Sequence, residues 1–148
     1  MINETIKLTG RVIITLYDDQ GVIKSVLDIP NLVVDVGKIY IANRIITPSP
    51  TYSVMTHMAI GISSAAPQVT DTTLGLEVYR SSLSSFTANN NVINATAAFN
   101  ANQGSGSITE AGIFNSSSGG IMLCHTQFPS VPKLITDAIS INWSITVS

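Results

Sequence analysis

The residue with the clearest chemical potential is Glu110, which lies in the apolar stretch 108–115 (ITEAGIFN). Downstream of Arg80 the chain carries only two other Lys, Arg, Asp or Glu residues, so this carboxylate has few ionic partners. An unpaired carboxylate is costly to bury. The nearest cation of suitable character is Arg80, in the segment LEVYR that also contains Glu77. We therefore predict a structural ion cluster of Glu77, Arg80 and Glu110.

The same carboxylates define an alternative, because a pair of acidic residues can hydrolyse a glycosidic bond. Glu77 and Glu110 would form that pair if a cleft held them a water's width apart, without Arg80 between them. Neutralisation by Arg80 favours the structural interpretation instead. The sequence thus argues against glycoside hydrolysis.

Nucleophilic and metal chemistry have little support in the sequence. Cys124 is adjacent to His125, but neighbouring residues of a strand point to opposite faces, so a catalytic pair would need His57. We expect Cys124 to be a buried core residue. Two histidines and one cysteine cannot supply a zinc site by themselves. The Gly-rich segments lack the pattern of a phosphate-binding loop, and the aspartates at 18–19 lack the spaced oxygen ligands of a calcium loop. The prediction is no enzyme, no metal and no cofactor.

The composition indicates one β-rich domain with an uncharged polar surface. The chain has 148 residues, of which 45% are hydrophobic and only 11% charged, against about 25% charged in ordinary soluble domains. None of its apolar runs reaches the roughly 18 residues of a membrane span. A Ser, Thr and Asn surface suits either a protein covered by its neighbours or a secreted adhesin or lectin-like domain.

The net charge and the cysteine content limit which partners the chain can bind and in which compartment we expect it to be made. The net charge of −2 and the absence of a basic patch argue against nucleic acid as a partner. One cysteine excludes an intrachain disulfide. The N-terminus does not read as a secretory signal, so we expect synthesis in a reducing cytoplasm.

Hydrophobic alternation and turn residues predict a largely β chain. The best-defined hairpin pairs 108–115 with 121–124 across the Ser/Gly loop 116–120. An Asp35-capped helix is expected over 36–46, with apolar positions 39, 42, 45 and 46 at helical spacing. Residues 128–133, with two prolines, are expected to be an irregular connection. The other expected strands are 6–17, 22–29, 57–62, 81–86, 92–99 and 138–147.

About eight strands and one helix favour an all-β, antiparallel sandwich. We expect residues 1–148 to form a single domain, with 1–8 as a candidate N-terminal arm. In that arm the candidate contacts with a neighbouring subunit or another partner protein are Met1, Ile2, Asn3, Glu4 and Thr5. The alternative is that Ile6 and Leu8 simply begin the first strand.

Four motifs follow one another along the chain: HMAIG at 57–61, L-x-x-E-x-x-R at 74–80, ITEAGIF at 108–114 and the Trp143 strand. Their order resembles that in a group of small structural proteins of tailed bacteriophages, and the resemblance covers residues 31–148. It implies a jelly-roll-like sandwich that trimerises and binds the major capsid protein as a decoration or cement protein. It also implies a place on the capsid surface of the virion, after synthesis in the host cytoplasm.

Two functions remain open from the sequence. The first is capsid cement, with the major capsid protein and identical chains in a homotrimer as partners, and with neither nucleic acid nor membrane. The second is a tail-fibre or tail-tip protein that binds a receptor or glycan. A low aromatic content of 6% favours the first, because sugars stack on exposed aromatic rings. The lack of a coiled-coil, collagen-like or β-helical repeat argues against a fibre shaft.

Overall fold

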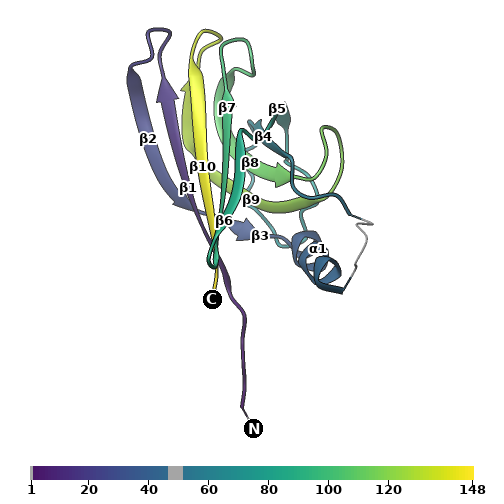
Figure 1. Ribbon diagram of the computed structural model, residues 1–148. Helices are drawn as coiled ribbons and strands as arrows, with labels where there is room; N and C mark the ends of the chain where they lie inside the picture. Colours follow the sequence, from purple (N-terminus) through teal and green to yellow (C-terminus); the bar gives the residue numbers. More distant parts are fainter. Residues whose placement is uncertain (1, 47–51) are drawn as a thin grey trace.

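The computed structural model describes residues 2–46 and 52–148 as two five-stranded antiparallel sheets packed face to face (Figure 1). The first sheet has the order β2 (Ile23–Pro30), β1 (Leu8–Tyr17), β10 (Ala138–Val147), β7 (Val92–Phe99) and β6 (Ser85–Asn89). The second has the order β3 (Leu32–Val33), β9 (Met122–Lys133), β8 (Gly106–Phe114), β4 (His57–Gly61) and β5 (Glu77–Ser82). The helix is α1 (Asp35–Ile46). The predicted all-β sandwich with one short helix is confirmed.

The core between the sheets follows from strand alternation. On β10 every second residue from Ile139 to Ile145 is buried, and Trp143 is only 1% exposed, as the sequence pattern predicts. The second sheet contributes side chains such as Ile60, Ile113 and Phe128 to the same cluster. Each such side chain stabilises the fold by roughly 1.5–3 kcal/mol relative to an exposed one. Alternating burial therefore fixes the register, because a shift of one residue would expose the whole row.

The predicted hairpin between β8 and β9 is confirmed, but β9 is longer than expected. It continues through Pro129 and Pro132 to Lys133, and pairs Pro132 with Ser107 of β8. The expected irregular connection over 128–133 is therefore wrong. The outer neighbour β3 pairs only with residues 124 and 125 of β9, so the rest of that edge has no paired strand among the described residues. Proline is tolerated there because a strand edge needs no N–H donor.

The expected strand over 81–86 is also wrong, because the chain changes sheets in its middle. The N–H of Leu83 donates to the carbonyl of Thr56, next to the second sheet. One residue later, the N–H of Ser84 donates to the carbonyl of Thr96 in the first sheet. The segment therefore ends β5 and begins β6. The turn after β6 is as predicted, with Asn90 in the left-handed region at φ 53°.

The helix begins at Asp35, one residue before the expected start, and buries a different face from the predicted one. Ile39, Ile45 and Ile46 are 58–79% exposed, whereas Gly37 and Tyr40 are buried. A Cβ on residue 37 would lie 2.1 Å from the carbonyl oxygen of Leu123 on β9. Glycine therefore sets the face of the helix that approaches the sheet.

The N-terminal segment lies outside the sandwich. Strand β1 begins at Leu8, and the exposed residues 2–6 lead away from the two sheets (Figure 1). Lys7 and Ser148 exchange backbone hydrogen bonds of 2.6 and 2.9 Å, which ties the base of the segment to the C-terminus. Met1 lies outside the described residues. The contact that this segment makes with a neighbour remains a prediction. Within the described ranges, none of the helical structure is long and apolar enough to cross a membrane.

Candidate functional site

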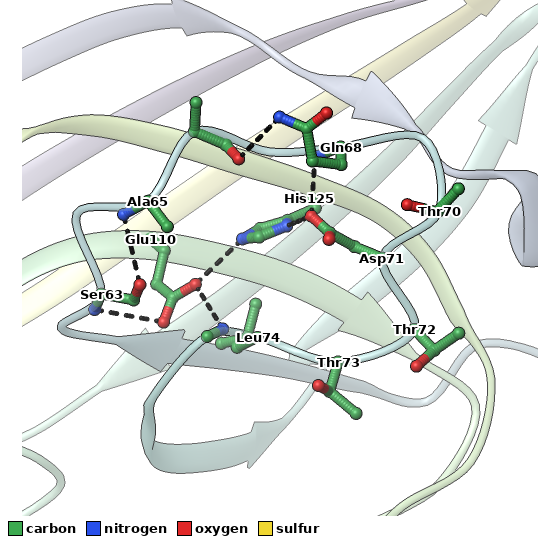
Figure 2. Close-up of a pocket in the computed structure, with 12 residues that line it drawn as sticks. Ser63, Ala65, Gln68, Thr70, Asp71, Thr72, Thr73, Leu74, Glu110 and His125 are labelled. Atoms are coloured by element: carbon green, nitrogen blue, oxygen red, sulfur yellow. Dashed lines mark hydrogen bonds and ion pairs between the residues drawn. The ribbon is translucent and has the colours of Figure 1, made fainter.

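A long connection covers the outer face of the second sheet. Residues 62–76 join β4 to β5 and pass over β8 and β9 (Figure 2). The connection contributes Leu74 to a small apolar cluster that is buried on that face, separate from the main core; its other members are Val34, Ala59, Phe114 and Met122. The N–H of Asp35, at the start of α1, donates to the carbonyl of Val69, so the connection is also attached to the helix. We call residues 62–76 the cover loop.

The cover loop is held by a chain of three ionisable side chains (Figure 2). Nδ1 of His125 lies 2.9 Å from Oδ2 of Asp71, and Nε2 of His125 lies 2.9 Å from Oε2 of Glu110. Glu110 is completely buried, and His125 is 3% exposed. Asp71 belongs to the loop, whereas the other two residues belong to β8 and β9. The imidazole therefore links the loop to the sheet.

Backbone amides complete the environment of Glu110. Its Oε1 accepts hydrogen bonds from the N–H groups of Leu76 at 2.7 Å and Ser63 at 3.3 Å, and its Oε2 accepts one from Gly75 at 2.9 Å. These donors lie at both ends of the cover loop. The carboxylate is therefore satisfied by three amides and one imidazole, as a buried charge requires.

Glu110 and His125 shift each other's pKa in opposite directions. Burial by itself would raise the pKa of Glu110, but the hydrogen bonds from His125 and from the three amides outweigh it and lower that pKa. Burial by itself would lower the pKa of His125, but its hydrogen bonds to Glu110 and Asp71 outweigh it and raise that pKa. Both shifts favour an ionised carboxylate beside a protonated imidazole.

Two glycines allow the close packing around this carboxylate. A Cβ on Gly61 would lie 2.4 Å from Oε1 of Glu110 and 2.5 Å from the carbonyl oxygen of Leu76. A Cβ on Gly75 would lie 2.4 Å from Oγ of Ser63. A larger residue at position 61 would displace Glu110 or the end of the cover loop, and one at position 75 would collide with Ser63 at the other end of the same loop.

The predicted partner of Glu110 is wrong. Arg80 instead pairs with Glu77, with distances of 3.0 Å from Nε to Oε2 and 2.6 Å from Nη2 to Oε1. Its Nη1 donates to the carbonyls of Ser116 and Gly119 in the β8–β9 loop. The guanidinium carbon also lies 3.7 Å from the centre of the Phe114 ring, a cation–π contact. Of the predicted cluster, only the Glu77–Arg80 pair forms.

The observed register of the β8–β9 hairpin, which includes a bulge between Ile113 and Phe114, brings Glu110 next to its true partner. Gly112 faces His125 across the hairpin, and Glu110 faces Gln127, so Glu110 and His125 are diagonal neighbours on one face. Counting only formally charged residues missed this pair, because a histidine becomes a cation when its surroundings raise its pKa.

The carboxylates and nucleophiles considered as catalytic groups have separate partners. Glu77 binds Arg80, whereas Glu110 binds His125 and the loop amides. Cys124 is fully buried in the main core, where burial raises the pKa of its thiol. His57 hydrogen-bonds the hydroxyls of Thr56 and Ser82 instead. Cys124 and His125 do lie on opposite faces of β9, as alternation predicts.

A polar pocket of about 400 Å³ lies beside the three ionisable side chains. Its lining comes mostly from the cover loop, with hydroxyls from Ser63, Thr70, Thr72 and Thr73. Asp71 is the part of the ionic chain most open to this pocket, since its side chain is 26% exposed. The arrangement can fix the loop and can offer hydroxyl and carboxylate groups to a small polar molecule.

The outer face of the first sheet is a second candidate, and it is almost uncharged. The strand register places short polar side chains side by side across β1, β10 and β7. The charged residues on it, Arg11 and Asp28, pair with each other at 2.9 Å. On β1, β10 and β7 the short uncharged polar residues of this face are Thr9, Thr15, Asn94, Thr96, Ser140, Asn142, Ser144 and Thr146. We call it the outer polar face.

Comparison with known proteins found no matching family model, no similar curated protein and no similar solved structure. The geometry of the cover loop and of the outer polar face is therefore the basis for a functional proposal.

Proposed function

We propose that this chain is a capsid decoration protein, which binds the outside of a tailed-phage head as a homotrimer and stabilises the shell. The observation that carries the proposal is the outer polar face. It is broad, lies on one sheet, and has its two charges paired with each other. Such a surface can be buried against the major capsid protein without stranding ions. The two-sheet sandwich agrees with the architecture that the phage resemblance implies.

The role of a clamp follows from many modest contacts. One protomer that contributes a polar face of this kind binds weakly, but three linked protomers bind with avidity, because each bound protomer raises the effective concentration of the others. The N-terminal segment, with Met1 to Thr5, would add a further contact to the shell or to a neighbouring protomer. Binding to the assembled shell stabilises it by mass action.

A tail-tip receptor or glycan-binding protein is the second candidate, and one observation favours it. The polar pocket beside Asp71 has the hydroxyl-rich lining that suits hydrogen bonds to a sugar. Its lining residues include no Trp, Tyr or Phe on which a sugar ring could stack. We therefore rank this function below capsid decoration.

Removal and restoration of the protein separate the two functions. Capsids that lack this chain should assemble but break at a lower temperature, and added protein should restore them in a concentration-dependent way. Virions that lose host attachment but keep normal shell stability would support the tail-tip function and contradict ours.

A matched pair of variants tests the outer polar face itself. Asn142→Lys places a charge at the centre of that face, whereas Ser117→Lys places the same charge in the exposed loop between β8 and β9. We expect at least a roughly tenfold loss of capsid binding for the first variant, because it desolvates an unpaired ammonium at the interface. Ser117→Lys should bind normally. Equal binding by the two variants, with unchanged melting, would exclude this face as the contact.

A further inference from the structure

An apolar groove opens at the end of the sandwich from which both termini leave. It has a volume of about 280 Å³ and lies between α1 and the ends of β1, β6, β7 and β10. Its lining is almost wholly aliphatic or aromatic and consists of Ile6, Leu8, Val33, Tyr40, Ile41, Ile45, Met55, Phe86, Ile93, Leu123, Ile145 and Val147. Ile45 is 79% exposed and Phe86 is 39% exposed. We call this site the end groove.

The N-terminal segment joins β1 at the rim of the end groove but does not fill the groove. Ile6 and Leu8 line the rim, and the residues before them lead away from the sandwich (Figure 1). Ile6 is 75% exposed and Ile2 is 95% exposed. In an extended segment positions 2, 4, 6 and 8 share one face. The segment thus presents isoleucines that its own domain leaves in water, next to a groove that lacks an occupant among the described residues.

Charge on the rim matches the one acidic residue of the segment. Glu4 lies between the two isoleucines on the same face of the extended chain. A shallower pocket adjoins the end groove, shares Ile6 and Leu8 with it, and includes Lys38. The side chain of Lys38 is 55% exposed, and its Nζ already lies 3.2 Å from Oδ1 of Asp35 on the same helix, so Glu4 would join an existing ion pair. A segment laid along both hollows could place isoleucine in the apolar groove and the carboxylate beside this ammonium.

We propose that the N-terminal segment of one copy docks in the end groove of a second copy. The direction of the segment favours exchange, because the chain before β1 runs away from its own sandwich (Figure 1) and Ile2 is 95% exposed. Four residues of extended chain span about 13 Å, enough to reach a neighbouring protomer. A closed ring of such exchanges generates a cyclic oligomer through heterologous contacts. The inference rests on the self-association in the proposed function, and not on capsid binding.

Cysteine cross-linking between two distinguishable chains tests this exchange in free protein. One chain carries Ile2→Cys, and a second chain of different tag length carries Ile45→Cys. The native Cys124 is fully buried and does not interfere. We expect oxidation of the mixture to give the mixed disulfide as the main product. As the control, Val22→Cys replaces the Ile45→Cys chain; residue 22 is 58% exposed and lies at the β1–β2 turn.

Each outcome bears on the proposal. A mixed disulfide at Ile45 but not at Val22 supports exchange, whereas equal yields indicate random collision and overturn it. A double variant, Ile2→Cys with Ile45→Cys, that forms only an intrachain disulfide would show that the segment closes its own groove. Ile2→Asp should also dissociate the oligomer to a 15.7 kDa monomer with an unchanged fold by circular dichroism. Because this experiment uses free protein without capsids, a negative result would overturn the exchange of segments and would leave capsid decoration untouched.

Discussion

Replacing Glu110 with glutamine should destabilise the protein strongly, although the two side chains have the same shape. Each carboxylate oxygen accepts a hydrogen bond from a backbone amide, one from Leu76 and one from Gly75. Glutamine can present oxygen to one of these amides, but its NH₂ group then faces the other donor. A buried donor without a partner costs about 1–3 kcal/mol. His125 also loses its anionic partner, so we expect a total of about 3–5 kcal/mol for breaking this buried pair.

Two measurements together test this reasoning. Urea unfolding gives the change in the free energy of unfolding, and hydrogen exchange of the Gly75 and Leu76 amides reports whether the cover loop opens. The exposed Asp28→Asn variant is the control and should leave both measurements unchanged, because solvent already hydrates that carboxylate. A loss below about 1 kcal/mol for Glu110→Gln, with unchanged exchange, would refute the view that this carboxylate holds the loop.

The Glu110–His125 pair should make the free energy of unfolding fall at both low and high pH. Because the pKa of Glu110 is lowered on folding, its contribution is present above its unfolded value and is lost as the pH falls through the folded one. Because the pKa of His125 is raised, its contribution is present below its unfolded value and is lost as the pH rises through the folded one. Stability should therefore fall on both sides of a mildly acidic window. A His125→Gln variant should lose the alkaline part of this dependence, and an unchanged alkaline profile would contradict it.

Three further substitutions test other contacts. Gly37→Ala should lower the melting temperature, although alanine favours a helix by about 1 kcal/mol, because the added Cβ collides with the carbonyl of Leu123; a higher melting temperature would show that the helix can shift. Arg80→Ala should cost about 1.5–3 kcal/mol in urea unfolding, since charged hydrogen bonds and the stacking on Phe114 are lost together; recovery in Arg80→Lys would indicate that charge alone matters. Lys133→Met should cost about 1–3 kcal/mol, because the buried ammonium donates to two backbone carbonyls; a neutral result would mean that water replaces these bonds.

The sequence determined the elements whose signal is local. Strict alternation along 138–147 placed Trp143 in the core, and the Ser/Gly loop before β9 identified the hairpin correctly. The Asn run at 89–91 and the capping residue Asp35 likewise marked a turn and a helix start within one residue. These features depend on backbone preferences and on the period of burial, which are properties of neighbouring residues.

Only the tertiary structure decided the partner of Glu110, the face of the helix and the end groove. Three of the hydrogen-bond donors to Glu110 are backbone amides of a loop more than thirty residues away, and backbone amides leave no trace in residue type. Gly37 looked like a weakness of the helix until the carbonyl of Leu123 was found against it. The end groove is lined by β1, β3, β6, β7, β9, β10 and α1 together. Such sites arise from the packing of distant segments, and residue types alone do not specify which segments meet.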